Sequence, residues 1–406
     1  MKKIILLISS IEEGFTYNTT LELSKKADLH IFHTNEIKHK YLIENVNYHL
    51  YKNKGFSNLS IKGLYVLIQV FSDFINSCNL LYIKKIIYNY HLFKSIYEKS
   101  DFILSEFKYV NLKSNNFRFL SFWMDDDATS LALLKKRKKI LKGFSMAHGR
   151  DLFEWREPDF GILPFKRFQL KYLDKIFSVS IYGSNYLRKK YPKFNNKINV
   201  FYLGSYDFGF KKQSSEDFTI ISCADIKALK RVHLIAQSLF FSNEKINWIH
   251  VGNLEYGSDK TSKKSLTNAL DELKKNKNIN FTFLGSIDNK SFMEIYRRQY
   301  VNLFVNVSTT EGLPFSMIEA SSFGVPIIST DVGGCSEIVD QFGVVLPVNL
   351  TPKNLIEEIL RFKHSKKNSQ INRNKIRANW ELKFNIEKNF NKLKDIFDKN
   401  LLFIII

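Results

Sequence analysis

Short apolar runs alternate with amphipathic segments along nearly the whole chain, and this alternation constrains the fold more than any other feature. Runs such as KIILLI (3–8), GFSMAH (143–148) and VPIIST (325–330) have the length and composition of buried parallel strands. Segments between such runs, for example 232–241 and 265–275, have helical periodicity. This alternation favours α/β architecture with parallel sheets covered by helices, and it argues against all-α and all-β folds.

The rhythm occurs twice, on either side of a polar, glycine-containing stretch at 204–217. We therefore expect two doubly wound domains, 1–204 and 205–380, facing one another across a cleft with ligands at the carboxyl ends of the strands. The other strand candidates are DLHIFHT (28–34), DFILSEF (101–107), RFLSFWM (118–124), KIFSVS (175–180), INVFYLG (198–204), FTIISC (218–223), INWIHVG (246–252), INFTFLG (279–285) and VNLFVNV (301–307). Further helix candidates are TTLELSKK (19–26), LLYIKKIIYNYHLFKSIYEKS (80–100), SNYLRKKYP (184–192) and SFMEIYRR (291–298).

The composition suits two packed cores, since 44% of the 406 residues are hydrophobic. The formal net charge of +21 favours an anionic partner, such as a nucleic acid, an anionic membrane or a phosphate-bearing substrate. Solvated lysine spread through the chain is the plain alternative. Cys78, Cys223 and Cys335 form no metal-binding spacing, so we expect reduced thiols and a cytoplasmic location.

The two ends of the chain are apolar but short. MKKIILLISS (1–10) begins like a signal peptide, yet no small-residue cleavage site follows, and we expect a first buried strand there. No stretch reaches the roughly 18 apolar residues of a membrane-spanning helix. The final LLFIII (401–406) leaves contact with a membrane or with a hydrophobic groove open.

Two glutamates flank a helix start in TTEGLPFSMIEASSFGVPIISTDVGG, residues 309–334. Pro314 suits the first helical position, where a missing N–H costs nothing, so we expect the helix to begin there. Glu311 then lies in the loop that leaves a strand, beside helix-start N–H groups that form an anion site. Glu319 follows Ser316 by three residues on the same helix face.

A nucleotide sugar fits this arrangement, because its diphosphate lies between a sugar and a ribose. The phosphate oxygens would lie on the helix N–H groups, with Glu311 toward one end and Glu319 toward the other. Carboxylates are good bidentate acceptors for neighbouring hydroxyls. The plain alternative is one glutamate in a turn and one facing solvent.

The longer segment NVSTTEGLPFSMIEASSFGVPIISTDVGGCSEIV (306–339) resembles the signature of family 4 glycosyltransferases, which have the two-domain GT-B fold. The resemblance implies that Glu311 contacts the donor sugar and that Glu319 holds the ribose. It also implies that backbone amides of the loop and helix start cradle the diphosphate, here those of Gly312, Leu313, Phe315 and Ser316.

The segment IISCADIKALKRVHLIAQSL (220–239) is similar to the first strand and helix of the donor domain in that family. The family's diphosphate-neutralising lysine matches Lys230, which would stabilise charge on the leaving nucleotide. Many relatives have an arginine where this chain has Asp225. Either Lys227 or Arg231 replaces it, or the diphosphate is held differently; the surface-lysine alternative stays open for both.

The segment 146–204, with its HGRD sequence, also resembles the family, especially members that build bacterial polysaccharides. His148 at a strand end would hydrogen-bond the transferred sugar across the cleft, and Asp151 would orient it or bind the acceptor; a purely structural histidine is the alternative. Relatives often have a glycine-rich loop after the first strand. Here Gly14 alone offers close backbone approach on the acceptor side.

Two charged runs have two interpretations each. The acidic run Asp125 to Asp127 resembles a metal-binding motif of another glycosyltransferase architecture, but helix capping explains it without a metal. The basic run KKRKKILK (135–142) either docks on anionic lipid or a lipid-linked diphosphate, or is the solvated face of a helix. In GT-B enzymes the terminal helices cross back onto the first domain, and 381–406 is similar; Trp380 is expected to pack there.

We therefore interpret the chain as a retaining glycosyltransferase of the hexosyltransferase type, with no metal and no cofactor beyond its nucleotide-sugar donor. The expected acceptor is a hydroxyl of a glycan or lipid-linked sugar in exopolysaccharide, capsule or lipopolysaccharide assembly, with peripheral contact to an anionic membrane. His148, Glu311 and Lys230 are the expected catalytic residues. The alternatives are a nucleotide-sugar epimerase on the same fold and a basic nucleic-acid-binding protein.

Overall fold

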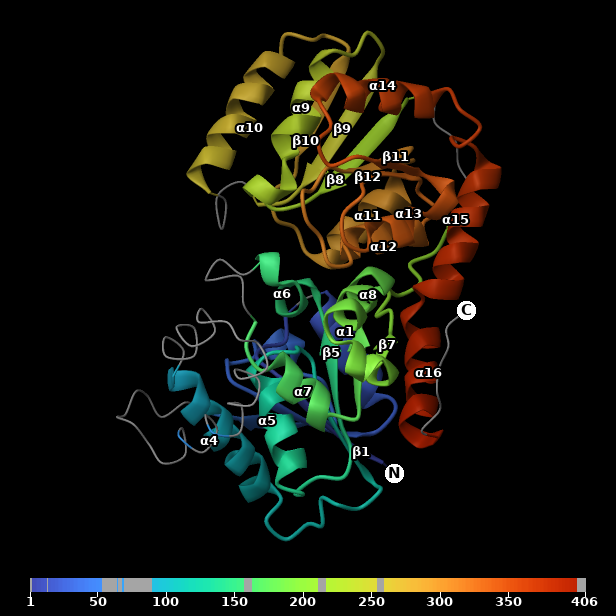
Figure 1. Cartoon of the computed structure of the whole chain (residues 1–406). Helices are drawn as coiled ribbons and strands as arrows, with labels where there is room; N and C mark the ends of the chain where they lie inside the picture. Colours follow the sequence, from blue (N-terminus) through green and yellow to red (C-terminus); the bar gives the residue numbers. More distant parts are fainter. Residues whose placement is uncertain are drawn as a thin grey trace. The chain divides into compact units, whose positions relative to one another are not determined.

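The computed structural model describes residues 2–12, 14–52, 64, 68, 90–156, 163–210, 217–253 and 259–399 (Figure 1). The chain forms two compact units, Met1–Tyr202 with Phe390–Ile406, and Leu203–Asn389. The expected boundaries after 204 and after 380 compare with divisions after Tyr202 and after Asn389, so the segment 381–406 is itself divided between the units.

The first unit is built on a seven-stranded sheet with the order β3-β2-β1-β4-β5-β6-β7. Its strands are β1 (Lys3–Ile8), β2 (Asp28–His33), β3 (Asn47–Leu50), β4 (Phe117–Ser121), β5 (Gly143–Ala147), β6 (Lys175–Ser178) and β7 (Ile198–Val200). Its α-helices in the described residues are α1 (Phe15–Ser24), α4 (Tyr90–Glu106), α5 (Asp126–Lys136), α6 (Gly149–Leu152), α7 (Lys166–Tyr172) and α8 (Ile181–Lys190). Short 3₁₀ turns are η1 (His39–Tyr41), η2 (Glu154–Arg156) and η3 (Pro192–Lys197).

The second unit is built on a six-stranded sheet with the order β10-β9-β8-β11-β12-β13. Its strands are β8 (Thr219–Cys223), β9 (Ile246–Val251), β10 (Ile279–Phe283), β11 (Leu303–Asn306), β12 (Ile327–Thr330) and β13 (Val344–Leu346). Its helices are η4 (Ala228–Lys230), α9 (Val232–Phe240), α10 (Lys260–Leu273), α11 (Asn289–Arg298), α12 (Phe315–Ser322), α13 (Cys335–Val339), η5 (Asp340–Phe342), α14 (Pro352–Lys363) and α15 (Gln370–Lys383), and α16 (Ile386–Lys399) continues into the first unit.

Both sheets are doubly wound, which confirms the predicted fold class. Every strand pairing among the described residues is parallel. The strand order reverses between β1 and β4 in one sheet and between β8 and β11 in the other. Such reversal points are where open α/β sheets bind ligands, outside the carboxyl ends of the strands.

One predicted strand is wrong. DFILSEF (101–107) continues α4, because apolar side chains over the longer window repeat with helical spacing. Phe93, Ile96, Ile103 and Phe107 lie on that repeat and are all buried in the core. A seven-residue window showed only an apolar run.

Two edge strands were not predicted, β3 and β13. Each has only three or four residues, and most of those residues are partly exposed. Neither therefore has the continuous apolar run of a central parallel strand.

Each unit has its own core. In the first, helices α4, α5 and α7 pack together and bury Phe119, Leu133 and Phe168 against the sheet. In the second, α9 contacts α10 and α14 in one helical layer, while α12 contacts α13 and α15 in another (Figure 1). Trp248 is fully buried in that core.

The C-terminal helices lie along the start of the second unit. Ser205 pairs with Asn385 in an isolated parallel bridge, and the Trp380 Nε1 donates to the Ser205 Oγ at 3.0 Å. Trp380 is fully buried, so its expected packing role is confirmed. Further along, Phe390 packs on Phe201 of the first unit, with ring centroids 5.3 Å apart. No helix in the described part of the chain is both long and apolar enough to cross a membrane.

Candidate active site

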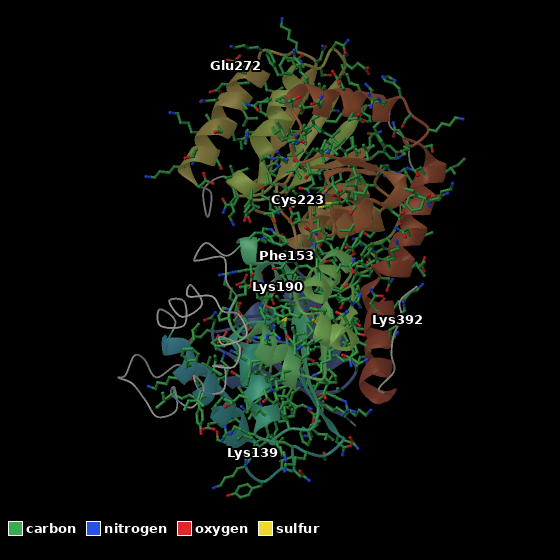
Figure 2. The ribbon with its side chains drawn as sticks, viewed as in Figure 1. Lys139, Phe153, Lys190, Cys223, Glu272 and Lys392 are labelled. Carbon is green, nitrogen blue, oxygen red and sulfur yellow. The ribbon has the colours of Figure 1, made fainter. Side chains whose placement is uncertain are left out.

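The reversal point of the second sheet carries the two charged residues that the sequence singled out. β8 ends at Cys223, labelled in Figure 2, and β11 ends at Asn306 on the neighbouring strand. The loops after these strands bring Lys230 and Glu311 together, with the Lys230 Nζ 2.5 Å from the Glu311 Oε1. The Thr309 N–H donates to the Leu229 carbonyl at 2.8 Å and fastens one loop to the other.

The ion pair is only partly open to solvent. The Glu311 side chain is 8% exposed, whereas the Lys230 side chain keeps 25% of its surface. A nearly buried carboxylate needs a partner, because desolvation of an unpaired charge is costly. The lysine supplies that partner and still presents part of its surface to an incoming anion.

The paired glycines after β12, Gly333 and Gly334, form a turn that contacts the backbone of the Glu311 loop. Gly333 has a φ of +56°, and a Cβ built on it would lie 2.1 Å from the Glu311 carbonyl oxygen. The Gly334 N–H donates to the Gly312 carbonyl at 2.7 Å. The backbone that carries Glu311 therefore rests directly on this turn, and a side chain at Gly333 would displace it.

Helix α12 starts one residue later than predicted. Pro314 has a φ of −71° and a ψ of 114°, which makes it the cap rather than the first helical residue. Its carbonyl accepts from the Met317 and Ile318 N–H groups at 3.2 and 3.4 Å. Gly312, Leu313, Phe315 and Ser316 are partly exposed around this helix start. N–H groups of a first helical turn point out of the helix and attract anions.

Glu319 lies one turn further along α12, but it does not face solvent as the plain alternative required. Glu319 is 3% exposed, and its Oε1 accepts from the Asn289 Nδ2 at 2.5 Å. Burial raises the pKa of the neighbouring Cys223 thiol to about 12, and the Glu319 charge adds to that rise. An ionised carboxylate can accept several hydrogen bonds, so the contact with Asn289 leaves room for hydroxyl donors.

Asn289 is a candidate site residue that the sequence reasoning missed. It is the first residue of α11, after the capping residue Asp288. An asparagine beside a helix start is common, so nothing in a single sequence distinguishes this one. Only the fold brings it to Glu319.

Arg231 and Lys227 were the two candidates to replace the arginine that many relatives have at the position of Asp225, and their contacts differ. The Arg231 guanidinium donates to the Val307 and Val348 carbonyls, both at 2.7 Å, and so ties together loops at the strand ends. Lys227 pairs with Asp225 at 3.0 Å on an exposed surface. Arg231 therefore has a structural task, and its donor-binding role stays a prediction.

The acceptor-side candidates gather at the carboxyl edge of the first sheet. The His148 Nε2 lies 3.0 Å from the Phe122 carbonyl after β4, so that nitrogen carries the proton. The Asp151 carboxylate accepts from the His148 N–H at 2.6 Å and from the Met124 N–H. Asp151 thus fixes the backbone of two loops, while its contact with an acceptor stays a prediction.

The His148 ring is enclosed by aromatic side chains. Phe122 stacks on it at 5.0 Å between centroids, Trp123 lies at 4.4 Å and Phe15 at 5.9 Å. Burial lowers the pKa of His148, so the ring is neutral and its Nδ1 is a hydrogen-bond acceptor. Gly14 precedes Phe15 with a φ of +93°, and a Cβ there would meet nothing within 4 Å. The positive φ explains why a glycine occupies position 14, whereas no close contact within the chain requires one.

The acidic run caps a helix, as the sequence indicated. The Asp125 side chain accepts from the Asp127 N–H at 2.9 Å at the start of α5. The three carboxylates lie close enough together to hold a metal ion. However, the buried Lys99 ammonium already contacts Asp126 at 2.9 Å and also Asp127, so the protein supplies its own cation there.

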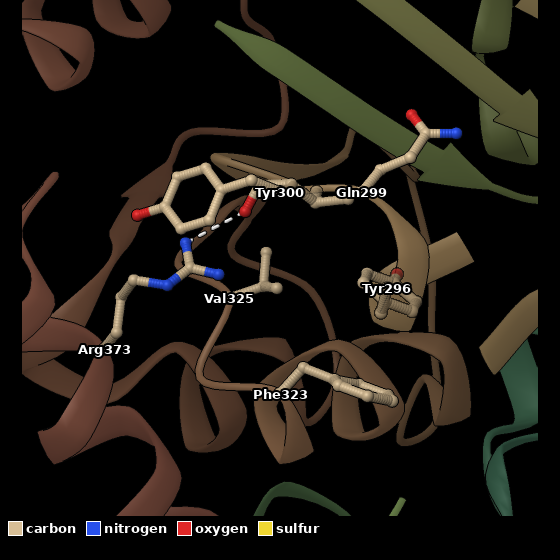
Figure 3. Close-up of a pocket in the computed structure, with 7 residues that line it drawn as sticks. Tyr296, Gln299, Tyr300, Phe323, Val325 and Arg373 are labelled. Carbon is tan, nitrogen blue, oxygen red and sulfur yellow. Dashed lines mark hydrogen bonds between the residues drawn. The ribbon is translucent and has the colours of Figure 1, made fainter. Parts of the chain in front are cut away.

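A small cavity behind α12 is not the substrate site (Figure 3). It has a volume of about 10 Å³, which holds at most one water molecule. Tyr296 stacks on Phe323 at 5.0 Å, and Arg373 lies 4.4 Å from the Tyr300 ring while donating to the Val301 carbonyl. These contacts hold α15 and the C-terminal ends of α11 and α12 together.

Residues 207–379 match the family model described as glycosyl transferases group 1. A stretch of 67 residues is 36% identical to the O-antigen biosynthesis glycosyltransferase WbnH of Escherichia coli. This stretch covers 16% of the chain and spans only 18% of that relative's length.

Two solved structures resemble nearly the whole chain. Anabaena HepE in complex with UDP-glucose has a TM-score of 0.71 at 12% identity, covering 99% of this chain and 100% of that one. The apo form of the lipopolysaccharide outer core galactosyltransferase WaaB has a TM-score of 0.68 at 14% identity, covering 98% and 100%. At such identities the likeness shows the fold alone.

The two doubly wound units and these structural neighbours define the chain as a protein of the GT-B class. Residues 207–379, which hold Lys230, Glu311 and Glu319, match the family model of the group 1 glycosyl transferases. The resemblance inferred from the sequence is therefore confirmed for the fold and, over residues 207–379, for the match to the family.

The turn at Gly333 provides a direct test of the site geometry. We expect Gly333→Ala to lower the melting temperature clearly, because alanine adds a backbone clash to the roughly 1–2 kcal/mol of a left-handed conformation. Gly285→Ala is the matched control, since Gly285 has a φ of +67° in the same unit and nothing within 4 Å of a Cβ. Equal losses in thermal unfolding of the two variants would contradict the close approach.

Proposed function

We propose that the chain transfers a sugar from a nucleotide-diphosphate donor to a hydroxyl of a glycan or lipid-linked acceptor, with retention of anomeric configuration. One observation carries the proposal. The Lys230–Glu311 pair, the start of α12 and the buried Glu319 lie at one reversal point of a doubly wound sheet.

Each part of such a donor has a complementary group in the second unit. The diphosphate would accept hydrogen bonds from the N–H groups at the start of α12 and from Lys230. Glu319, oriented by Asn289, would accept from the ribose hydroxyls. Glu311 would accept from a hydroxyl of the transferred sugar once the phosphate competes for its lysine. The UDP-glucose complex of the structurally similar HepE supports a nucleotide-sugar ligand for this fold.

The proposed reaction needs positioning and charge stabilisation more than covalent catalysis. The bond from the anomeric carbon to the diphosphate oxygen breaks on the face that the acceptor oxygen approaches. The acceptor's proton then passes to the departing diphosphate, so no protein nucleophile is required. The Lys230 ammonium opposes the negative charge that grows on the leaving group, an effect that can lower a barrier by about 3 kcal/mol. No metal is required for that role in the proposal.

The first unit is proposed to hold the acceptor at the edge where His148, Asp151 and Gly14 gather. The neutral His148 presents an acceptor nitrogen, which suits a sugar hydroxyl. The O-antigen glycosyltransferase WbnH supports polysaccharide or lipopolysaccharide assembly as the pathway. Cytoplasmic location and peripheral membrane contact stay predictions from the cysteines and the net charge.

The two alternative functions predict different observations. A nucleotide-sugar epimerase would convert the donor to an epimer without any acceptor, which product analysis would detect. A nucleic-acid-binding protein would bind arbitrary duplexes with a steep salt dependence and would not respond to nucleotide sugars.

Nucleotide binding tests the donor site. We expect one of UDP, GDP or ADP to raise the melting temperature, and we expect Lys230→Ala and Glu319→Ala to lower its affinity at least about tenfold, as for loss of a charge-assisted hydrogen bond. Lys274→Ala and Glu272→Ala are matched controls on an exposed helix of the same unit. The readout is the ligand-induced shift, which is separate from any loss of intrinsic stability. No shift with any nucleotide at low salt would contradict the proposal.

The ribose of the nucleotide provides a narrower test of the role proposed for Glu319. Wild type should prefer the stabilising ribonucleoside diphosphate over its 2′-deoxy form by about tenfold or more, because a buried carboxylate would lose a hydroxyl partner. Glu319→Ala should abolish this preference, and Asn289→Ala should reduce it by freeing the carboxylate. Titration calorimetry with both nucleotides measures the ratio. A preference that survives in Glu319→Ala would assign the ribose to other residues.

A further inference from the structure

Four aromatic side chains of the first unit gather where η2 lies beside α8. Phe153 directly follows α6 and stacks on Trp155 of η2, with ring centroids 4.5 Å apart and 19° between the ring planes. Tyr182 and Tyr186, one turn apart on α8, both lie nearly perpendicular to Phe153, at 5.5 and 5.4 Å. Phe153 is labelled in Figure 2. We call Phe153, Trp155, Tyr182 and Tyr186 the aromatic platform.

The outward surface of this platform is open, whereas its base is buried. Phe153 is buried and covers one face of the Trp155 indole, yet Trp155 is 54% exposed. The Tyr186 centroid is nearly equidistant from Trp155 and Phe153, at 5.0 and 5.4 Å, so Tyr186 lies beside the stacked pair. Tyr182 is exposed as well. Grouped exposed aromatic side chains mark an interaction site more often than scattered ones do.

Charged groups border the aromatic rings. The Glu154 carboxylate pairs with the Lys190 ammonium, and Figure 2 labels Lys190. The Lys190 Nζ also lies 5.9 Å from the centroid of the Tyr186 ring. Both charged side chains keep part of their surface exposed. The platform therefore combines a flat apolar face with a hydrogen-bond acceptor and a hydrogen-bond donor at its rim.

The platform is continuous with the edge where we place the acceptor. Asp151 lies in α6, two residues before Phe153, and Tyr182 lies in the first turn of α8, directly after β6. The chain from Asp151 to Trp155 spans at most about 14 Å, because one residue extends no more than about 3.6 Å. A short oligosaccharide held at Asp151 is therefore long enough to place another of its sugars on Trp155.

We propose that the aromatic platform binds a second sugar of the acceptor, so that the acceptor is an oligosaccharide and not a single sugar. A pyranose ring carries C–H groups on one face and hydroxyls around its rim. Its apolar face would cover the Trp155 indole while its hydroxyls reach Glu154 and Lys190. A hydrocarbon chain would also cover the indole, but it would desolvate the charged pair without offering it any hydrogen bond.

A groove in the second unit is the rival site for a glycan. It lies between α9 and α10, and its volume is about 580 Å³. Phe240 and Phe241 are exposed there, but their rings stand at 77° to one another and form no flat stacked surface. The Lys353 Nζ lies 5.7 Å from the centroid of the Phe241 ring. The stacked indole, next to the proposed acceptor edge, therefore suits a sugar ring better.

Glycan binding by the full chain tests the inference, which rests on the proposed function because it assumes a glycan acceptor. The probe is an array of bacterial oligosaccharides and their component monosaccharides, followed by titration of the best oligosaccharide. We expect wild type to prefer an oligosaccharide over its monosaccharides by about tenfold or more. Trp155→Ala should lose at least about tenfold in that affinity, because both the apolar contact and the stacked face are removed.

Two conservative variants separate stacking from simple apolar burial. Trp155→Phe keeps a flat ring and should stay within about threefold of wild type. Trp155→Leu keeps an apolar side chain without a flat face, so it should lose as much affinity as Trp155→Ala. Full affinity in Trp155→Leu would indicate a hydrocarbon ligand and would overturn the proposal.

Two exposed aromatic residues elsewhere provide matched controls. Tyr109→Ala changes a residue of the first unit that is 91% exposed, and Phe241→Ala changes the rival groove. Both should bind the oligosaccharide as wild type does. The proposal is overturned if wild type binds no oligosaccharide, if it binds the monosaccharides equally well, or if Trp155→Ala keeps full affinity. Nucleotide-induced stabilisation of the same proteins reports on the donor site, so failure of the proposed function would be seen separately.

Discussion

The ion pair between Lys230 and Glu311 is the interaction on which the rest of the site depends. It joins the loops after β8 and β11 at the point where the strand order reverses. Breaking a fully buried pair costs about 3–5 kcal/mol, and less here because the Lys230 side chain keeps 25% exposure. A donor whose diphosphate binds the lysine must therefore offer Glu311 a replacement partner, and a hydroxyl of its sugar is one. Donor binding and rearrangement of the pair are linked by this requirement.

The two units differ in how completely their own groups satisfy the candidate site residues. In the second unit, Glu319 accepts a hydrogen bond from the Asn289 amide, and Lys230 is partly open. In the first, Asp151 holds two backbone N–H groups and His148 bonds a carbonyl inside an aromatic cage. The charged groups of the second unit therefore indicate a donor ligand more clearly than the groups of the first unit indicate an acceptor.

Much of the fold was predictable, because central parallel strands are continuous apolar runs and their order along the chain sets the sheet topology. The predictions failed where a local window was ambiguous. The apolar residues of DFILSEF fit both the two-residue period of a strand and the 3.6-residue period of a helix. Only the longer apolar repeat from Phe93 to Phe107 identifies a helix. In the site, Glu311 and Glu319 were singled out by their spacing around a helix start, and Lys230 by the resemblance to the family. Asn289 and the Gly333 contact with the Glu311 carbonyl depend on loops far apart in sequence, and spacing alone does not specify such contacts.

The most direct test of the central claim is a crystal structure of the chain with the nucleotide-sugar donor that it binds. The account predicts that the diphosphate lies at the start of α12 with the Lys230 Nζ turned toward it. It also predicts the ribose hydroxyls on Glu319 and the Glu311 carboxylate released from its lysine. A nucleotide bound elsewhere, or bound there with the Lys230–Glu311 pair unchanged and no ribose hydroxyl on Glu319, would contradict it.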